Sequence, residues 1–265
     1  IKMFEQPNAV RDGVVDMVHT PGSFYGAAVP EIDAMVASTK NATEARANGG
    51  TAMMDAAHQK RFNVKYLAWI DSGVGFNIFT VNEPKFRSSD GVLDMSGVKM
   101  RDNPIYTAFL KSLEATTSPM PSTEVYGALE KGVIDAAPWT TIGITDLKWN
   151  KFLNYMVEPS FYSTDLGIIV NLDRWNGLSA EAKAILQDVA IEWEQKSHND
   201  RKADISKYKA AYKEGGMDFV SHSDSGGANY LKLAYDSVWA RATERMTDKG
   251  DGGDVAKLRA LYAPE

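Results

Sequence analysis

Helical tracts alternate with short apolar segments along almost all of this 265-residue chain. Residues 42–62 have a helix-favouring composition with one weak point at Gly49-Gly50, and apolar segments predicted to be strands follow at 64–70 and 76–81. The polar stretch 84–97 is predicted to be a loop. This alternation is typical of α/β proteins, and the length allows one large domain or two modest ones.

The second half of the chain continues the alternation with longer helices. Residues 166–171 are predicted to form a buried strand, and a long helix is expected from the cap Ser179 to about residue 213. One face of that helix carries apolar residues at helical spacing, namely Ile185, Leu186, Val189 and Trp193. A further helix is expected over 227–246. An earlier helix is predicted to begin at Ser122, whose side chain can cap the first turn.

Two distant segments share one pattern. Residues 10–17 and 129–136 each read as a helix end, a glycine stop, two apolar residues predicted to be a strand, and an aspartate. An aromatic-bearing loop follows each segment. The match is either chance or a sign of two lobes of similar design. In the second case both loops would face a shared cleft, because open α/β sheets bind ligands beyond their strand ends.

Composition excludes several classes of function. The chain has no cysteine, so disulfides, thiolate nucleophiles and cysteine metal sites are excluded. The net charge of −6 argues against nucleic acid as a partner. No apolar run is long enough for a membrane-embedded helix, and no secretory leader is expected at the start. The four histidines form no metal or catalytic motif, so no metal and no cofactor are predicted.

Arg101 is the strongest candidate for binding chemistry. It ends an alternating segment after a loop, where its planar guanidinium can recognise a carboxylate. A surface ion pair is the alternative. Trp139 follows a strand end, as a core residue or as a pocket wall. Other aromatic residues also lie in loops at strand ends, which suits a cleft that closes over an organic ligand: Phe24, Tyr25, Phe161 and Tyr162.

An ordered set of short motifs resembles a known family. The segments 97–101, 119–126, 129–135, 159–162 and 170–179 are similar to the substrate-binding subunits of tripartite ATP-independent periplasmic (TRAP) transporters, the DctP-like family. The resemblance covers nearly the whole chain. It implies a periplasmic α/β protein of the two-lobed, class II periplasmic-binding-protein type, with a long helix linking the lobes.

The resemblance also implies how the chain is divided. Residues 1–79 and 164–205 would form lobe I, and 80–163 and 206–265 would form lobe II, with the ligand cleft between them. The family usually opens with a strand and a helix that have no counterpart before Ile1. Contacts from that segment are therefore not assigned.

The resemblance implies a function as well. The arginine matching Arg101 pairs with a ligand carboxylate, and the position of Asn77 lines the cleft. Asn77 in place of the family's second arginine disfavours sialic acid, and Trp139 favours an apolar or aromatic wall. Pro138 replaces the glutamate that holds a metal in the 2-oxoacid branch. The further polar candidates are Ser122, Thr140 and Asp165, and the aromatic ones are Phe24, Tyr25 and Tyr162.

The expected ligand is a small organic acid, either a monocarboxylate with an apolar or aromatic body or a small hydroxy or oxo acid. The expected partners are TRAP membrane subunits. Two other classes stay open on the residues alone. One is an enzyme whose site is assembled from distant residues. The other is a ligand sensor that partners a receptor.

Overall fold

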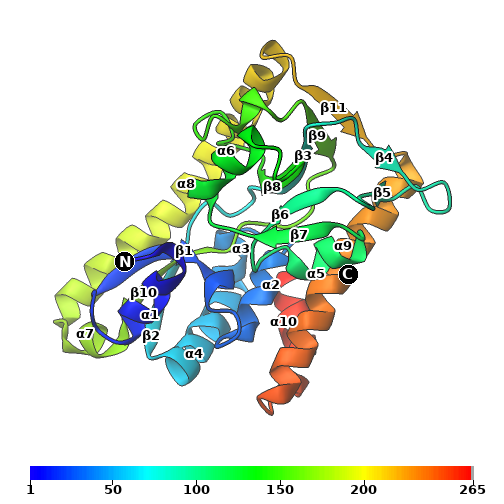
Figure 1. The fold of residues 1–265 in the computed structure, drawn as a ribbon. Coiled ribbons are helices and arrows are strands. Elements are labelled where there is room, and N and C mark those ends of the chain that lie inside the picture. The colour runs from blue at the N-terminus through cyan, green and yellow to red at the C-terminus, as the bar shows by residue number, and fades with distance from the viewer. Residues whose placement is uncertain (264–265) are drawn as a thin grey trace. The chain divides into compact units, whose positions relative to one another are not determined.

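The computed structural model describes residues 1–263 and contains two compact units. Unit 1 comprises residues 1–73, 163–202 and 239–263. Unit 2 comprises residues 74–162 and 203–238. Figure 1 shows the helices and strands of both units. Helices and strands occur in each, which confirms the predicted α/β class.

Unit 1 is built on a three-stranded sheet in the order β1-β10-β2. These strands are Met17–Pro21, Leu166–Asn171 and Val64–Trp69, and the central strand β10 is antiparallel to both neighbours. The prediction of a buried strand at 166–171 is confirmed to the residue. β2 ends one residue before the predicted boundary.

The helices α1 (Gln6–Arg11), α4 (Gly50–Phe62) and α7 (Leu172–Gly177) contact the strands of this sheet. Where 42–62 was predicted as one helix, two form, because Gly49 adopts φ 91° and separates them. Asn41 and Glu44 make a capping box that starts the first of the two. The helices and 3-10 turns that lie wholly in unit 1 are η1 (Met3–Glu5), α1 (Gln6–Arg11), η2 (Gly22–Phe24), η3 (Pro30–Ile32), α2 (Asp33–Val36), α3 (Ala42–Ala47), α4 (Gly50–Phe62), α7 (Leu172–Gly177), η5 (Gly252–Asp254) and α10 (Val255–Tyr262).

Unit 2 contains a six-stranded mixed sheet in the order β11-β9-β3-β8-β6-β7. Its strands are β3 (Phe76–Thr80), β6 (Lys99–Asp102), β7 (Thr116–Pro119), β8 (Ala136–Thr140), β9 (Tyr155–Glu158) and β11 (Asp218–Ser221). The polar stretch predicted as a loop instead contains a short antiparallel hairpin, β4 (Lys85–Phe86) with β5 (Leu93–Asp94). The helical elements within unit 2 are α5 (Thr107–Ser112), α6 (Ser122–Glu130) and η4 (Trp149–Lys151).

Two long helices contain residues of both units. α8 spans Ala180–Glu214, which are 35 residues, and α9 spans Asp224–Asp248. The long helix predicted from Ser179 to about residue 213 is thereby confirmed, and Ser179 Oγ accepts a hydrogen bond from the Ala182 amide. Among the described residues, no helix has the length and apolar character needed to cross a bilayer.

The glycine stops predicted in the two similar segments are present. Gly13 and Gly132 have φ of 71° and 63°, and each closes a helix in the same way. Their amides donate to Val10 and Leu129, and the amides of the next residues donate to Ala9 and Ala128, which is the Schellman pattern.

The strands predicted directly after these glycines were wrong. β1 and β8 begin only after the aspartate of each segment, at Met17 and Ala136. Val14 and Val133 are exposed instead of lying in a sheet. Both valines sit in the second position after the helix, where the amide is already bonded to the helix end and is not free to join a strand.

The two compact units differ from the lobe boundaries expected from sequence. Residues 74–79 fall in unit 2, because β3 is hydrogen-bonded between β8 and β9. Residues 239–263 fall in unit 1, where α10 packs against α2 and α4.

Candidate functional site

Arg101 lies inside unit 2, on strand β6. Its side chain is almost fully buried, with 1% of its surface exposed. Nε donates to the Met120 carbonyl at 3.2 Å, and Nη1 lies 3.4 Å from both the Tyr106 hydroxyl and the Pro138 carbonyl. All of these partners are neutral. The alternative of a surface ion pair is therefore excluded.

Two aromatic rings flank the guanidinium. Its central carbon lies 5.4 Å from the centroid of Trp139 and 5.7 Å from that of Tyr106. Trp139 comes from β8 and is half-buried, with its ring edge against Trp149. At these distances the rings attract the cation through their π faces. Sequence reasoning missed Tyr106, although its position shortly after Arg101 was a usable signal.

Among the described residues 1–263, no carboxylate oxygen forms a hydrogen bond or ion pair with the Arg101 guanidinium. The adjacent Asp102 carboxylate accepts instead from the Asn103 amide at 2.6 Å and from the Thr107 hydroxyl at 3.0 Å. Burial raises the pKa of Asp102, and the Arg101 charge opposes that rise only in part. A buried, unpaired cation is costly unless an anion compensates it. The site is thus electrostatically suited to an anion.

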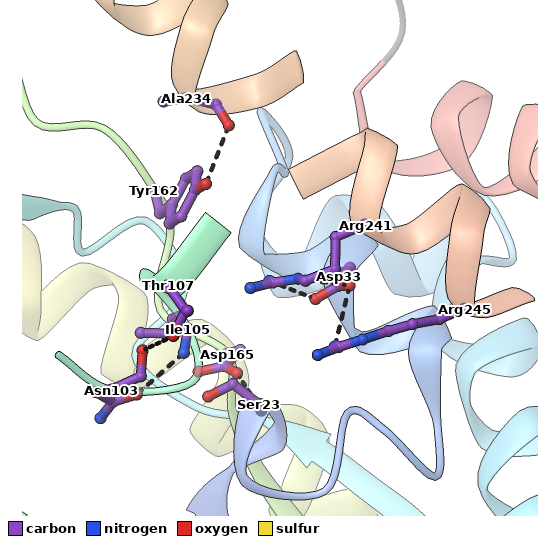
Figure 2. A network of polar contacts seen from close by, with 10 residues as sticks. All are labelled: Ser23, Asp33, Asn103, Ile105, Thr107, Tyr162, Asp165, Ala234, Arg241 and Arg245. Atoms are coloured by element: carbon purple, nitrogen blue, oxygen red, sulfur yellow. Dashed lines mark hydrogen bonds and ion pairs between the residues drawn. The ribbon is translucent and has the colours of Figure 1, made fainter. Parts of the chain in front are cut away.

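The loop after β6 is held in place by its own polar groups. Asn103 Oδ1 accepts from the Ile105 amide at 3.0 Å, and the Thr107 hydroxyl donates to the Asn103 carbonyl at 3.2 Å (Figure 2). This turn leads directly to Tyr106. The ring beside the guanidinium is therefore positioned by a local hydrogen-bond network.

Asn77 is fully buried and hydrogen-bonded within unit 2. It lies opposite Trp139 in the β3–β8 pair. Its Nδ2 donates to the Val157 carbonyl at 2.8 Å, and its Oδ1 accepts from the hydroxyls of Thr141 and Ser160. The amide thus connects β3 with β9 and with the segment after β8. Its oxygen is already occupied by protein donors.

The two predicted hydroxyl contacts lie in the same unit. Thr140 Oγ1 donates to the Ile142 carbonyl at 2.6 Å. Ser122 is half-buried, and its predicted capping role was wrong. The cap position is Pro121, whose extended backbone places Ser122 inside the first turn, and no side chain caps the helix.

Tyr162 is buried in an aromatic cluster of unit 2. Its hydroxyl donates to the Ala234 carbonyl at 3.0 Å (Figure 2). Its ring packs against Phe109 and Phe161 at centroid distances of 5.8 and 5.0 Å. These contacts give Tyr162 a place in the interior of the unit.

In unit 1, Asp165 lies directly before β10 and is buried. One of its carboxylate oxygens accepts from the Ser23 amide at 2.5 Å (Figure 2). Burial raises the pKa of Asp165 to about 6, although the bonds from Ser23 oppose the rise. Near neutral pH this group is therefore able to exist with or without its proton.

Phe24 and Tyr25 follow β1 in the same unit. The Tyr25 hydroxyl is bonded to Nε2 of His58 at 3.0 Å, and its ring stacks on Phe62. Phe24 is half-buried and contacts Phe4 edge-on, with ring centroids 4.7 Å apart. Tyr25 is thus an interior residue of unit 1, and its hydroxyl already has a partner.

One charged cluster was not found from sequence. The buried Asp33 accepts from Nε and Nη2 of Arg241 at 3.0 and 2.6 Å, and Nη1 of Arg245 lies 3.5 Å away (Figure 2). Asp33 lies 208 residues before Arg241 in the chain, and no sequence motif links it to the two arginines. Asp33 belongs to α2 and both arginines belong to α9, so only the tertiary structure of unit 1 brings them together.

No group of three or more potential metal ligands occurs in the part of the chain that the structure describes. Two features of the described residues suit ligand binding: the buried guanidinium with aromatic faces in unit 2, and the titratable carboxyl of Asp165 in unit 1.

The sequence matches the model of one protein family. Residues 3–244 match DctP, described as bacterial extracellular solute-binding protein, family 7. The chain is 28% identical to a monocarboxylate 2-oxoacid-binding periplasmic protein of Nostoc sp. over 197 residues, 70% of this chain and 52% of the relative. It is 27% identical to a C4-dicarboxylate-binding periplasmic protein of Rhodobacter capsulatus, over 74% of this chain and 57% of the relative. The matches thus span about half the length of these relatives.

Solved structures share the fold. A TRAP solute-binding protein from a marine metagenome, described as specific for aromatic acid ligands, has a TM-score of 0.80 at 24% identity, covering 98% of this chain and 83% of that one. A TRAP periplasmic solute-binding protein from Rhodoferax ferrireducens with bound malonate has a TM-score of 0.78 at 21% identity, covering 98% and 81%. The family expected from the sequence motifs is confirmed, and the chain belongs to the bacterial extracellular solute-binding proteins of family 7, the DctP family.

Proposed function

We propose that this chain is the solute-binding component of a TRAP transporter and captures a small organic acid through Arg101. The observation that carries the proposal is the buried guanidinium without a carboxylate partner. A bound carboxylate would supply the missing negative charge and accept from Nη2, the guanidinium nitrogen that no acceptor of the described residues occupies. Family membership supports a binding protein rather than an enzyme.

The ligand class follows from the surroundings of the guanidinium. Trp139 and Tyr106 offer aromatic faces beside it. A carboxylate seated on Arg101 would place the adjoining carbon skeleton near these rings. This favours a monocarboxylate with a flat or apolar body. The structural relative that is described as specific for aromatic acids lends support.

Asp165 narrows the proposed class of ligand further. In the proposed mode the ligand carboxylate binds Arg101, and a second polar group of the ligand contacts Asp165. A buried carboxyl with a raised pKa accepts a hydrogen bond from a ligand hydroxyl, or donates one to an oxo group when it is protonated. We therefore propose an aromatic or small hydroxy or oxo acid. The remaining candidates would shape the binding site without carrying its charge: Asn77, Ser122, Thr140, Phe24, Tyr25 and Tyr162.

The proposed place of action is the periplasm, where the loaded protein would deliver the acid to the TRAP membrane subunits. The family is one of extracellular proteins, and the curated relatives are named as periplasmic. The membrane subunits would carry out the transport.

The test is ligand binding by Arg101 variants. A thermal-shift screen of organic acids identifies a ligand, because one present at 100 times its dissociation constant adds about 2.7 kcal/mol to native stability. Calorimetry then compares the wild type with Arg101→Gln. Loss of the charged partner should cost about 2–5 kcal/mol, which is roughly a 30- to several-thousand-fold loss of affinity.

Arg101→Lys is the matched control. It keeps the charge but not the planar fork, so its affinity should fall between those of the wild type and the glutamine variant. If Arg101→Gln binds the acid as tightly as the wild type, the proposed anchor is wrong. If a screen of carboxylates yields no ligand while neutral solutes bind, the proposed solute class is wrong.

A further inference from the structure

The ring of His222 contacts four elements of unit 2. Nε2 lies 3.2 Å from the Leu93 amide on β5, and Nδ1 lies 2.8 Å from the Glu158 carbonyl at the end of β9. The ring also packs against Phe86 of β4 and Tyr230 of α9, with centroids 4.7 and 4.4 Å away. His222 therefore lies at the base of the β4–β5 hairpin.

These two bonds determine the protonation state of the ring. A backbone amide only donates, so Nε2 must offer its lone pair to Leu93. A carbonyl only accepts, so Nδ1 must carry the proton and donate it to Glu158. The arrangement requires neutral histidine. A second proton on Nε2 would point at the Leu93 N–H. The Leu93 amide would then have no acceptor on the ring.

The tip of the hairpin is attached to α9 by contacts that do not titrate. Asn229 Nδ2 donates to the Asp90 carbonyl at 2.9 Å. The backbones of Gly91 and Gly226 touch so closely that a Cβ on Gly226 would lie 2.5 Å from the Gly91 oxygen. Acid is thus expected to loosen the base of the hairpin and leave its tip attached to α9.

The charged groups around His222 are mostly engaged elsewhere. On β9, the Glu158 carboxylate pairs with Lys209, and in the hairpin Arg87 pairs with Asp90. Asp94 accepts from the Ser96 amide. Lys85 lies on β4, and Asp224 and Tyr230 lie on α9. Among the described residues none forms an ion pair with the ring, so no carboxylate stabilises its charged form.

We propose that His222 is a pH-sensitive latch, which holds the base of the β4–β5 hairpin while it is neutral and releases it when protonated. Burial lowers the pKa of His222, in keeping with a ring that the fold maintains uncharged. The stabilisation is present above the ordinary histidine pKa and is lost as the pH falls below it. The hairpin continues through the buried Met95 into β6, the strand of Arg101. Weaker solute binding in acid is a second consequence, and it rests on the proposed function.

NMR of the whole labelled chain tests the latch without any ligand. We expect the Leu93 amide resonance to move with the same midpoint as the His222 ring, and its protection from exchange to fall about three- to tenfold, as for the loss of one hydrogen bond. Amides of β3 should stay unchanged, which separates release of the hairpin from unfolding. An unchanged Leu93 amide across the titration of the ring overturns the latch. So does unfolding of the whole chain before the ring is protonated.

His222→Gln provides the matched variant. Glutamine can still accept from the Leu93 amide but does not titrate, so the hairpin should become insensitive to acid. His19→Gln, in unit 1, should leave the transition intact. An acid response of Leu93 in His222→Gln equal to that of the wild type overturns the proposal. If this variant does not fold, the comparison of the two wild-type midpoints still decides. Loss of solute binding by Arg101→Gln at neutral pH reports on the proposed function separately.

Discussion

The guanidinium of Arg101 and the indole of Trp139 meet within unit 2 with 5.4 Å between the guanidinium carbon and the ring centroid. They come from β6 and β8, which are adjacent strands of the six-stranded sheet. The pair combines an unneutralised buried cation with a flat apolar surface. Under the proposed function, this combination would favour an organic anion over an inorganic one.

Replacing Trp139 with leucine should weaken binding of the acid. The change removes the π face beside Arg101, an interaction worth about 0.5–2 kcal/mol, or roughly a 2- to 30-fold change in affinity. Calorimetry with the acid found by screening measures the effect. Trp139→Phe retains a ring and should lose less. Equal affinities for the leucine variant and the wild type would contradict a role for the indole.

Replacing Asp165 with asparagine should change how stability depends on pH. Because burial raises the pKa of Asp165 to about 6, the folded state prefers the protonated carboxyl. The stability that the protonated Asp165 carboxyl contributes is fully present below the unfolded-state pKa of about 4, and it is lost as the pH rises to about 6. Asp165→Asn should therefore be more stable than the wild type at pH 7 by about 2–3 kcal/mol. Asparagine still accepts from the Ser23 amide. Urea unfolding from pH 4 to pH 8 checks this, and a difference that does not vary with pH would refute it.

Replacing Asp33 with asparagine should destabilise unit 1 strongly. The variant leaves the guanidinium groups of Arg241 and Arg245 without their shared carboxylate, and loss of one partner of a buried ion pair costs about 3–5 kcal/mol. Urea unfolding measures the loss. Asp12→Asn breaks the exposed pair with Arg11 and should have no measurable effect. Similar stabilities for the two variants would contradict the structural role of Asp33.

Replacing each of two nearby glycines with alanine should change the stability of the protein in opposite directions. Gly127 lies inside α6 and Gly132 follows its end with φ 63°, and an added Cβ meets nothing within 4 Å at either position. Gly132→Ala should lower the free energy of unfolding by about 1–2 kcal/mol, because only the backbone conformation is penalised. Gly127→Ala should raise the free energy of unfolding by about 0.5–1 kcal/mol. Thermal unfolding of both variants checks the sign, and a stabilised Gly132→Ala would show that the turn is not required.

Neighbouring residues in the sequence determine where the regular helices and strands of this protein form. The apolar run 166–171, the long helical tract after Ser179 and the stops at Gly13 and Gly132 depend on neighbouring residues and on backbone conformation, so the sequence alone predicts them. The sequence also singled out Arg101, an arginine at a strand end within a series of family motifs, and its role as the ligand anchor stays a prediction.

Only the tertiary structure decides which side chains contact one another. Ile185, Val189 and Trp193 share a helix face, yet each is about half exposed, because spacing cannot tell what covers a face. The amide oxygen of Asn77 is bonded to Thr141 and Ser160, and Asp33 meets arginines from α9. Such contacts join positions far apart in the chain. They depend on how strands and helices pack together, which residue spacing does not encode.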